Sequence, residues 1–384
     1  MSKRTLPLDG ITVLEFAQFM AGPSAGLRLA DLGARVIKIE RPKVGEAGRK
    51  IALKNLFLDG SSLVFHTANR NKESFTANLK DAEDLEKVKA LIQIADVMTH
   101  NFRPGVMEKI GLDYSSVQKI NPRMIYASVT GYGTKGPWAK KPGQDLLIQS
   151  MSGFATLSGN KNDAPTPVGA AVSDIITGTH LVQGILAGLL RRQKTNQGAS
   201  VEVSLLESTL DLQFEGITTY LNDKKRLPTR AAKGSAHVYL GAPYGIYPTK
   251  NGYLTLAMGS VVKLGEILNC EALSVFENEE SWFTQRDQIM DILRNFLSTQ
   301  TTQHWLDILE PHDIWCSDVF DYQTLLSHEG FTVLGMDQSL SLLSGEKVHT
   351  TRCPIRINDE RLYHAKPAPR VGQHTDAIIQ EFDL

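Results

Sequence analysis

Residues 11–40 read ITVLEFAQFMAGPSAGLRLADLGARVIKIE, and this stretch decides the fold. It opens with the β-rich run Ile11–Phe16, and a break follows at Gly22-Pro23. The apolar residues of Ser24–Asp31 then have helical spacing, and Arg35–Ile39 is again β-rich. Two strands around a short helix form a βαβ unit, whose strands run parallel.

The same alternation recurs further along the chain. Asp81–Ile94 has the pattern of an amphipathic helix, whereas Asp96–Thr99 and Met124–Val129 are short β-rich runs. Strands that alternate with helices in this way predict an open α/β sheet with helices on both faces.

The second half of the chain has a different pattern. Ser204–Tyr220 is expected to be one helix, and the charged, proline-containing stretch Asn222–Arg230 is the best linker. Pro243–Ala257 alternates like a hairpin that turns at Asn251-Gly252. Three further helices are expected, at Trp282–Leu297, Thr302–Leu309 and Thr375–Phe382.

These patterns predict two domains. Residues 1–225 are expected to form the N-terminal part of a large domain, and residues 226–324 a small α+β domain. Residues 325–384 are expected to return to the large domain.

Composition excludes several classes of protein. The 384 residues include 41 basic and 42 acidic side chains, a balance that disfavours nucleic-acid binding. The three cysteines form no C-x-x-C pair, which argues against a zinc or thioredoxin-type site and fits a reducing compartment. The most apolar run, Ile175–Leu190, is too short and too polar to span a bilayer, and the first residues lack a signal-peptide core. We expect a cytoplasmic protein without a metal centre or a membrane segment.

Three motifs allow both a structural and a functional interpretation. Gly131–Gly136 matches G-x-G-x-x-G after a strand, but no helix follows, so a glycine-rich loop is favoured over a dinucleotide site. Asp174 precedes a long apolar helix and could cap it or serve as a nucleophile among small residues. Gln144-Asp145 follows a Pro-Gly turn, where Asp145 could cap the next helix or belong to a site.

Charged and aromatic residues also follow the ends of predicted strands. Arg41 and Lys43 come after one strand, and Asn101–Gly105 comes after another. Ligands of open α/β sheets bind at the carboxyl ends of strands, so these cations could meet phosphates and Phe102 a base.

Taken together, these motifs resemble those of the class III coenzyme A transferases, a family that includes formyl-CoA and carnitine-type CoA transferases and the α-methylacyl-CoA racemases. The resemblance covers nearly the whole chain. It is carried by Leu8–Leu14, Ala21–Pro23, Leu32–Glu40, Asn101–Gly105, Asn121–Ser128, Gly131–Gly133, Gln149–Gly153 and Pro369–Thr375.

The resemblance implies a Rossmann-like large domain built from both chain ends, a smaller domain, and an interlaced homodimer. It also implies covalent catalysis, in which the aspartate matching Asp174 attacks an acyl-CoA thioester. An aspartyl anhydride and then an aspartyl-CoA thioester would form before a small carboxylic acid accepts the CoA. CoA would enter as substrate, with no permanently bound cofactor.

The resemblance further implies a set of binding residues. CoA contacts would fall on Met20, Ala21, Arg41, Asn71, Lys72, Asn101, Phe102, Arg103 and Lys109. Substrate contacts would fall on Gln18, Gln144, Asp145, Gly241 and Tyr244.

The sequence departs from the formyl-CoA transferases at two places. The stretch Val238–Gly245 lacks the run of glycines found in those enzymes, and Gln18 and Met20 stand where they have His and Gln. Both departures argue against formyl-CoA and oxalate as the substrate pair.

Two alternatives remain open. Racemases of this family use a His in a Gly-His-Asp triplet as a general base, but here the triplet reads Gly143-Gln144-Asp145. An amide has no basic nitrogen, which favours the transferase. A catalytically silent CoA-binding protein is the other alternative.

Overall fold

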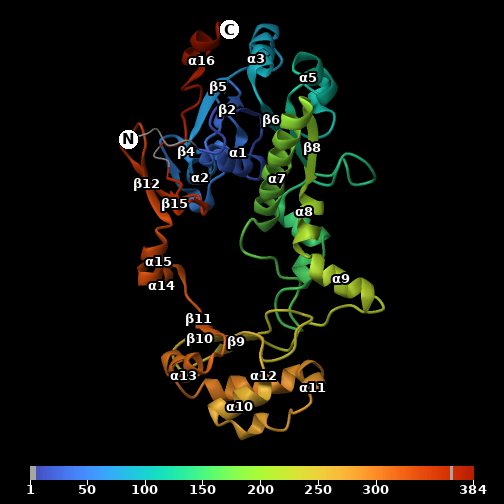
Figure 1. Cartoon of the computed structure of the whole chain (residues 1–384), viewed down its shortest axis with the longest axis vertical. Coiled ribbons are helices and arrows are strands. Elements are labelled where there is room, and N and C mark those ends of the chain that lie inside the picture. Colours follow the sequence, from blue (N-terminus) through green and yellow to red (C-terminus); the bar gives the residue numbers. More distant parts are fainter. Residues whose placement is uncertain (1–5, 364–365) are drawn as a thin grey trace. The chain divides into compact units, whose positions relative to one another are not determined.

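The computed structural model describes residues 6–363 and 366–384, which form two compact units (Figure 1). The first unit contains the residues up to Ile148 together with Ala171–Leu212 and Leu334–Leu384. The second contains Gln149–Ala170 and Gln213–Val333.

A parallel sheet is the centre of the first unit. Among the described residues its strands are β1 (Thr12–Glu15), β2 (Arg35–Glu40), β5 (Lys72–Thr76), β6 (Val97–His100), β7 (Ile125–Thr130) and β8 (Ala199–Ser204). Their spatial order is β5-β2-β1-β6-β7-β8, and every neighbouring pair is parallel. The chain winds outward from β1 in one direction and from β6 in the other. The boundary between β1 and β6 is therefore the switch point at which open α/β sheets bind ligands.

Helices cover both faces of this sheet, as the alternation of strands and helices predicts. Helices α1 (Ala21–Asp31) and α7 (Val172–Thr195) pack on one face, and α3 (Ala82–Ile94), α5 (Tyr114–Ile120) and α16 (Thr375–Phe382) on the other. Along β1, Val13 belongs to the first core and Leu14 to the second, because successive strand side chains point to opposite faces.

Helices α1 and α7 approach each other closely at Gly178. A Cβ on Gly178 would lie 2.2 Å from Ser24 Oγ and 2.8 Å from the Ala21 carbonyl oxygen. A larger residue would therefore force the first turns of the two helices apart.

Shorter elements complete the first unit. They are η1 (Ala47–Lys50), η2 (Leu53–Asn55), β3 (Phe57–Leu58), β4 (Ser61–Ser62), α2 (Leu63–Asn69), α4 (Val106–Lys109), α6 (Asp145–Met151, which begins here), α8 (Leu205–Leu212), β12 (Asp337–Ser341), β13 (Lys347–Thr351), β14 (Arg356–Ile357) and β15 (Glu360–Arg361).

The second unit has an antiparallel sheet in the order β11-β10-β9 and its own core. Its elements are η3 (Phe154–Thr156), α9 (Phe214–Asn222), β9 (Gly245–Pro248), β10 (Tyr253–Leu256), α10 (Val261–Leu268), η4 (Glu271–Leu273), α11 (Glu279–Thr284), α12 (Arg286–Leu297), α13 (Thr302–Leu309), η5 (Glu310–His312), β11 (Cys316–Asp318), α14 (Tyr322–Ser327) and α15 (Glu329–Leu334, which begins here). The predicted hairpin at Asn251-Gly252 is confirmed as the β9–β10 pair.

Some expected elements differ from the observed ones. The single helix expected at Ser204–Tyr220 is wrong, because β8 ends at Ser204 and the chain leaves helical geometry at Gln213, between α8 and α9. A similar break at Gln285 divides Trp282–Leu297 between α11 and α12. Strands β5 and β8 were not expected from the local pattern.

The compact units also divide the chain at other positions than the expected 225/226 and 324/325. The observed divisions fall at 212/213 and 333/334, and residues 149–170 belong to the second unit. Long-range hydrogen bonds explain this last assignment. Lys161 N–H donates to the Ala231 carbonyl over 2.8 Å, and Arg230 Nη1 donates to the Ser158 carbonyl over 2.7 Å.

Candidate active site

The loop from β1 to α1 lies at the switch point of the sheet. Phe16 N–H donates to the Thr99 carbonyl at 2.8 Å, which extends the contact between β1 and β6 beyond the strands. The Asn101 side chain then binds Gln18 twice, because its Oδ1 accepts from Gln18 N–H at 2.8 Å and its Nδ2 donates to the Gln18 carbonyl at 2.6 Å. Asn101 therefore fixes the loop in this structure, in addition to any contact with a ligand.

Helix α1 begins directly after this loop. Met20 occupies its N-cap position, and the Met20 side chain accepts no hydrogen bond from the N–H groups of the helix. The first N–H groups of a helix lack intrahelical partners, so those of Ala21 and Gly22 are donors near the switch point. Pro23, the next residue, has no N–H. Gly22 is required by packing, because a Cβ there would lie 2.3 Å from Ala17 Cβ.

Asp174 lies in the first turn of α7, beside the start of α1. It is one turn before Gly178, the residue that contacts Ala21 and Ser24, and residues four apart share a helix face. Its side chain is half-buried, and among residues 6–363 and 366–384 its carboxylate has no hydrogen-bond or ion-pair partner.

Asp145 caps α7 from outside that helix. Its Oδ1 accepts from Ser173 N–H at 2.8 Å and from Asp174 N–H at 3.4 Å, and the N-cap position itself is Ala171. The interpretation of Asp174 as an N-cap is therefore wrong: it is the third residue of the helix, and its carboxylate is not used for capping. Asp145 caps α7 rather than only the helix it begins.

Burial and the nearby Asp145 carboxylate together raise the pKa of Asp174 to about 7, burial being the larger cause. The side chain therefore changes charge near neutral pH. Perturbed carboxyl groups of this kind are concentrated at functional sites.

The glycine-rich loop after β7 supports the same region. A Cβ on Gly143 would lie 2.5 Å from Gly131 Cα, so the two backbones touch where only glycines fit. This contact holds the segment that carries the exposed Gln144 and the capping Asp145. The glycines act through close packing, as expected for a loop that is not a dinucleotide site.

Exposed cations occupy the carboxyl ends of several strands. Arg41 follows β2, whereas Arg103 and Lys109 follow β6. None of the three has an ion-pair partner among the described residues, so they remain free for an anionic ligand. Phe102 is half-buried and stacks on His100, with ring centroids 6.2 Å apart and an interplanar angle of 20°.

The structure does not support Lys72 as a CoA ligand. It is completely buried, and its Nζ donates to both Glu15 carboxylate oxygens, to the Pro23 carbonyl and to Asn69 Oδ1. These four acceptors saturate the ammonium group. Lys72 is a structural residue here, and Asn71 beside it donates to Asp31 Oδ1 over 3.0 Å.

The Lys72 and Asn71 backbones also lie at the amino end of β5, whereas the Lys72 side chain reaches the Pro23 carbonyl in the first turn of α1. At the carboxyl end of β5 the chain instead presents Lys80, which is exposed and which the sequence analysis missed. Recognising β5 as a strand would have pointed to it, because ligand-binding cations follow strand ends.

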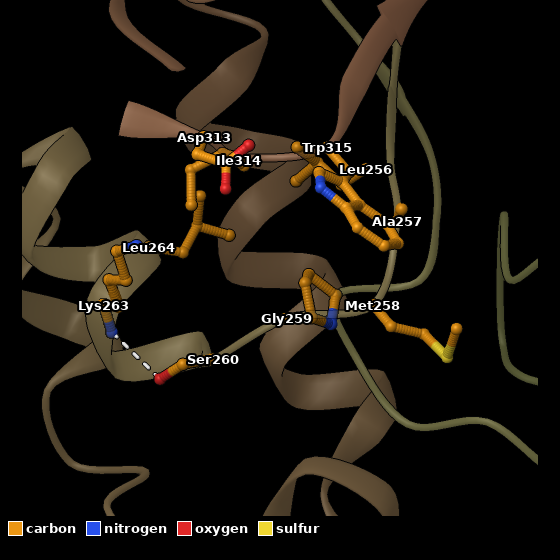
Figure 2. Close-up of a pocket in the computed structure, with 11 residues that line it drawn as sticks. Leu256, Ala257, Met258, Gly259, Ser260, Lys263, Leu264, Asp313, Ile314 and Trp315 are labelled. Carbon is orange, nitrogen blue, oxygen red and sulfur yellow. Dashed lines mark hydrogen bonds between the residues drawn. The ribbon is translucent and has the colours of Figure 1, made fainter. Parts of the chain in front are cut away.

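Gly241 and Tyr244 belong to the second unit, so their part in substrate binding stays a prediction. Tyr244 N–H donates to the Gly241 carbonyl over 3.3 Å, and a Cβ on Gly241 would lie 2.8 Å from the Trp282 carbonyl oxygen. A cavity of about 190 Å³ in the same unit is lined by Met258, Lys263, Trp315 and neighbours, and includes neither residue (Figure 2).

Among the described residues, none of the helices has the length and apolar character needed to cross a membrane. In the same residues, His, Cys, Asp and Glu side chains do not gather in groups of three that could hold a metal ion.

Residues 8–375 match the model of CoA-transferase family III, and the chain belongs to this family. It is 32% identical to a succinate–glutarate CoA-transferase of Agrobacterium fabrum, over 100% of this chain and 97% of the relative. It is 31% identical to the succinyl-CoA:glutarate CoA-transferase of Mus musculus, over 98% of this chain and 86% of the relative. A crystal structure of a CAIB/BAIF family protein from Brucella suis matches with a TM-score of 0.85 and 31% identity, covering 99% of this chain and 100% of that one.

Proposed function

We propose that the protein transfers CoA from an acyl-CoA thioester to a small carboxylic acid, with Asp174 as the covalent nucleophile. One observation carries the proposal: the half-buried Asp174 carboxylate has no partner among the described residues and lies beside the first turn of α1. A neighbouring carboxylate, Asp145, accepts from the N–H groups of Ser173 and Asp174 at the start of α7, and the Asp174 carboxylate takes no part in capping.

The reaction would proceed by four exchanges of bonds. The Asp174 carboxylate attacks the donor acyl carbon, the C–S bond breaks, and an aspartyl anhydride and CoA thiolate form. The thiolate attacks the Asp174 carbonyl carbon, which gives aspartyl-CoA thioester and releases the donor acid. The acceptor carboxylate attacks this thioester and expels the thiolate, which then attacks the acceptor acyl carbon and regenerates Asp174. Each step replaces one activated acyl group by another, so one difficult exchange is divided into several easier ones.

The geometry suggests how the substrate would lie. The N–H groups of Ala21 and Gly22, at the start of α1, would stabilise negative charge that develops on the thioester oxygen. Arg41, Arg103, Lys109 and Lys80 are exposed cations that could bind the CoA phosphates. Gln144 would hold the acyl group by hydrogen bonds, since an amide can donate and accept but cannot take up a proton.

The acids are proposed from the relatives. Those named above act on succinate and glutarate, so we propose small dicarboxylic acids as donor and acceptor. We propose an interlaced homodimer as the working assembly from the family resemblance alone. The departures around Gln18, Met20 and Val238–Gly245 are the reason to test oxalate separately.

Oxygen labelling tests the covalent step directly. The protein is incubated with unlabelled succinyl-CoA and with glutarate that carries ¹⁸O in both carboxyl groups. The peptide containing Asp174 is then analysed by mass spectrometry. The mechanism requires one ¹⁸O in Asp174 and one in the glutaryl thioester after a single turnover. Glutaryl-CoA formation without label in Asp174 would exclude this mechanism, and Asp174→Ala should form no aspartyl-CoA.

A further inference from the structure

The β1–α1 loop is fixed through three consecutive residues by side chains from elsewhere in the first unit. Lys38 Nζ donates to the Ala17 carbonyl at 2.8 Å, and Asn101 binds both backbone groups of Gln18. Phe19 N–H donates to Glu46 Oε2 at 2.9 Å. These contacts fix the backbone immediately before Met20 and Ala21.

Phe19 has an unusual backbone conformation. Its φ is +68°, in the left-handed region that residues other than glycine rarely adopt, and its side chain is 50% exposed. Burial of the ring therefore gives little compensation for the backbone strain. Strained residues of this kind persist where surrounding contacts hold them, and they are concentrated at active sites.

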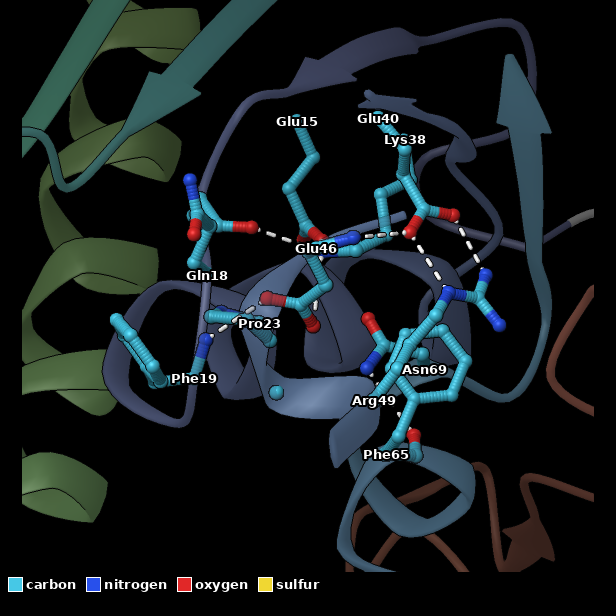
Figure 3. Close-up of polar contacts among 12 residues, drawn as sticks. Glu15, Gln18, Phe19, Pro23, Lys38, Glu40, Glu46, Arg49, Phe65 and Asn69 are labelled. Atoms are coloured by element: carbon cyan, nitrogen blue, oxygen red, sulfur yellow. Dashed lines mark hydrogen bonds and ion pairs between the residues drawn. The ribbon is translucent and has the colours of Figure 1, made fainter. Parts of the chain in front are cut away.

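Glu46 belongs to a buried charge cluster beneath this loop (Figure 3). Glu46 Oε1 lies 3.5 Å from Lys38 Nζ, which also donates to Glu15 Oε1 at 2.9 Å. Glu46 N–H donates to Glu40 Oε2, and Glu40 pairs with Arg49. With Lys72, the cluster contains three acidic and three basic side chains, none more than 4% exposed.

One detail indicates that Glu46 serves the loop as well as the fold. Its Oε1 accepts no hydrogen bond among the described residues, although a buried carboxylate oxygen without one is costly. The orientation that leaves Oε1 without a hydrogen bond is the one that brings Oε2 to Phe19. Gly26 also leaves space for the cluster under α1, because a Cβ there would lie 1.8 Å from Glu15 Oε2.

We propose that Glu46 is a positioning residue for CoA transfer: it holds Phe19 in the left-handed conformation that sets the start of α1 beside Asp174. This proposal rests on the proposed function. Glu46 is not expected to touch the substrate, and it acts through the loop. Loss of its contact should therefore slow the chemical step more than it weakens binding of the CoA phosphates, because three of the four proposed phosphate cations, Arg103, Lys109 and Lys80, lie on other segments.

Glu46→Ala removes the acceptor for Phe19 N–H, whereas Glu46→Gln keeps an acceptor oxygen of the same shape. Glu73→Gln is the matched control, because Glu73 also forms ion pairs, with Arg35 at 2.9 Å and Lys366 at 3.2 Å, but does not contact the loop. Hydrogen–deuterium exchange of residues 16–20, kcat, and the Kd for free CoA are measured for the wild type and all three variants.

We expect Glu46→Ala to exchange about tenfold faster in residues 16–20 and to lose about 10- to 100-fold in kcat, with Kd for free CoA changed by less than about threefold. Glu46→Gln should recover most of kcat, and Glu73→Gln should match the wild type.

Two results would overturn the proposal. Unchanged exchange in Glu46→Ala overturns the loop contact, and faster exchange with wild-type kcat overturns the positioning role. If Glu46→Ala does not fold, the Glu46→Gln variant becomes the test. A kcat and an exchange rate equal to those of the wild type support the proposal, and a tenfold loss of kcat without faster exchange overturns it. A wild-type protein that transfers no CoA would instead refute the proposed function, which is seen before any variant is made.

Discussion

Replacing Asp174 by Asn should abolish CoA transfer and, at alkaline pH, stabilise the protein. The folded-state pKa of Asp174 is about 7, against 3.8 for an ordinary Asp. Between these values the folded protein holds a proton that the unfolded chain releases, so the contribution of Asp174 to stability falls as pH rises towards 7. The asparagine of the Asp174→Asn variant carries no charge and does not incur this loss.

The size of the gain follows from the pKa difference of about 3, which corresponds to at most about 4 kcal/mol above pH 7. Because Asp174 is only half-buried and the N-terminus of α7 favours an anion, we expect about 1–2 kcal/mol. For a unit of this size, that is a rise in Tm of about 2–6 °C.

The assay is thermal unfolding of wild type and Asp174→Asn at pH 4.5 and pH 8.5. The variant should unfold at a higher temperature only at pH 8.5. Asp113→Asn is the control, because hydrogen bonds from Ser116 lower the pKa of Asp113 and its loss should give no gain at pH 8.5. An equal difference between Asp174→Asn and wild type at both pH values, or a less stable variant at pH 8.5, would refute the reasoning.

Four further outcomes are expected. In a pH–rate profile, kcat/KM should rise with pH through an apparent pKa near 7, because only ionised Asp174 can attack the thioester. The Asp145→Asn variant should show the same rise at a pH lower by about one unit, because it lacks the neighbouring negative charge. No deuterium should enter the α-position of a 2-methylacyl-CoA in deuterated buffer, since Gln144 cannot act as a base; uptake seen by mass spectrometry would favour a racemase. Lys80→Ala should raise KM for acyl-CoA several-fold, and less so at high salt, in steady-state kinetics. Light scattering should give the mass of a dimer that persists at nanomolar concentration, because linked chains separate only on unfolding.

The sequence predicted the framework of the first unit because its signals are local. The β-rich run around Val13 and the helical spacing of Ser24–Asp31 depend only on neighbours in the chain, and both elements are confirmed. Strand β5 escaped prediction because Lys72, Glu73 and Ser74 place polar side chains in a strand. Lys72 is tolerated there because Glu15, far away in the sequence, neutralises it.

The same distinction between local and distant contacts explains the errors in the site. The motif around Asp174 left a helix cap and a nucleophile both open, and its neighbours in sequence could not show that Asp145 caps the helix from 29 residues away. The resemblance placed a CoA contact on Lys72, but in the folded chain Lys72 is buried at the amino end of β5, and Lys80 is the exposed lysine that follows the carboxyl end of that strand.

Asp145 illustrates how capping would be linked to the proposed catalytic role of Asp174. A carboxylate that caps its own helix is held by hydrogen bonds from backbone N–H groups, which lower its pKa and nucleophilic reactivity. With Asp145 as the cap, Asp174 keeps its oxygens free while burial and, to a smaller extent, the Asp145 charge raise its pKa. Exchanging the cap for Asn keeps the hydrogen bonds and removes only that charge, so Asp145→Asn separates the structural from the electrostatic contribution of one residue.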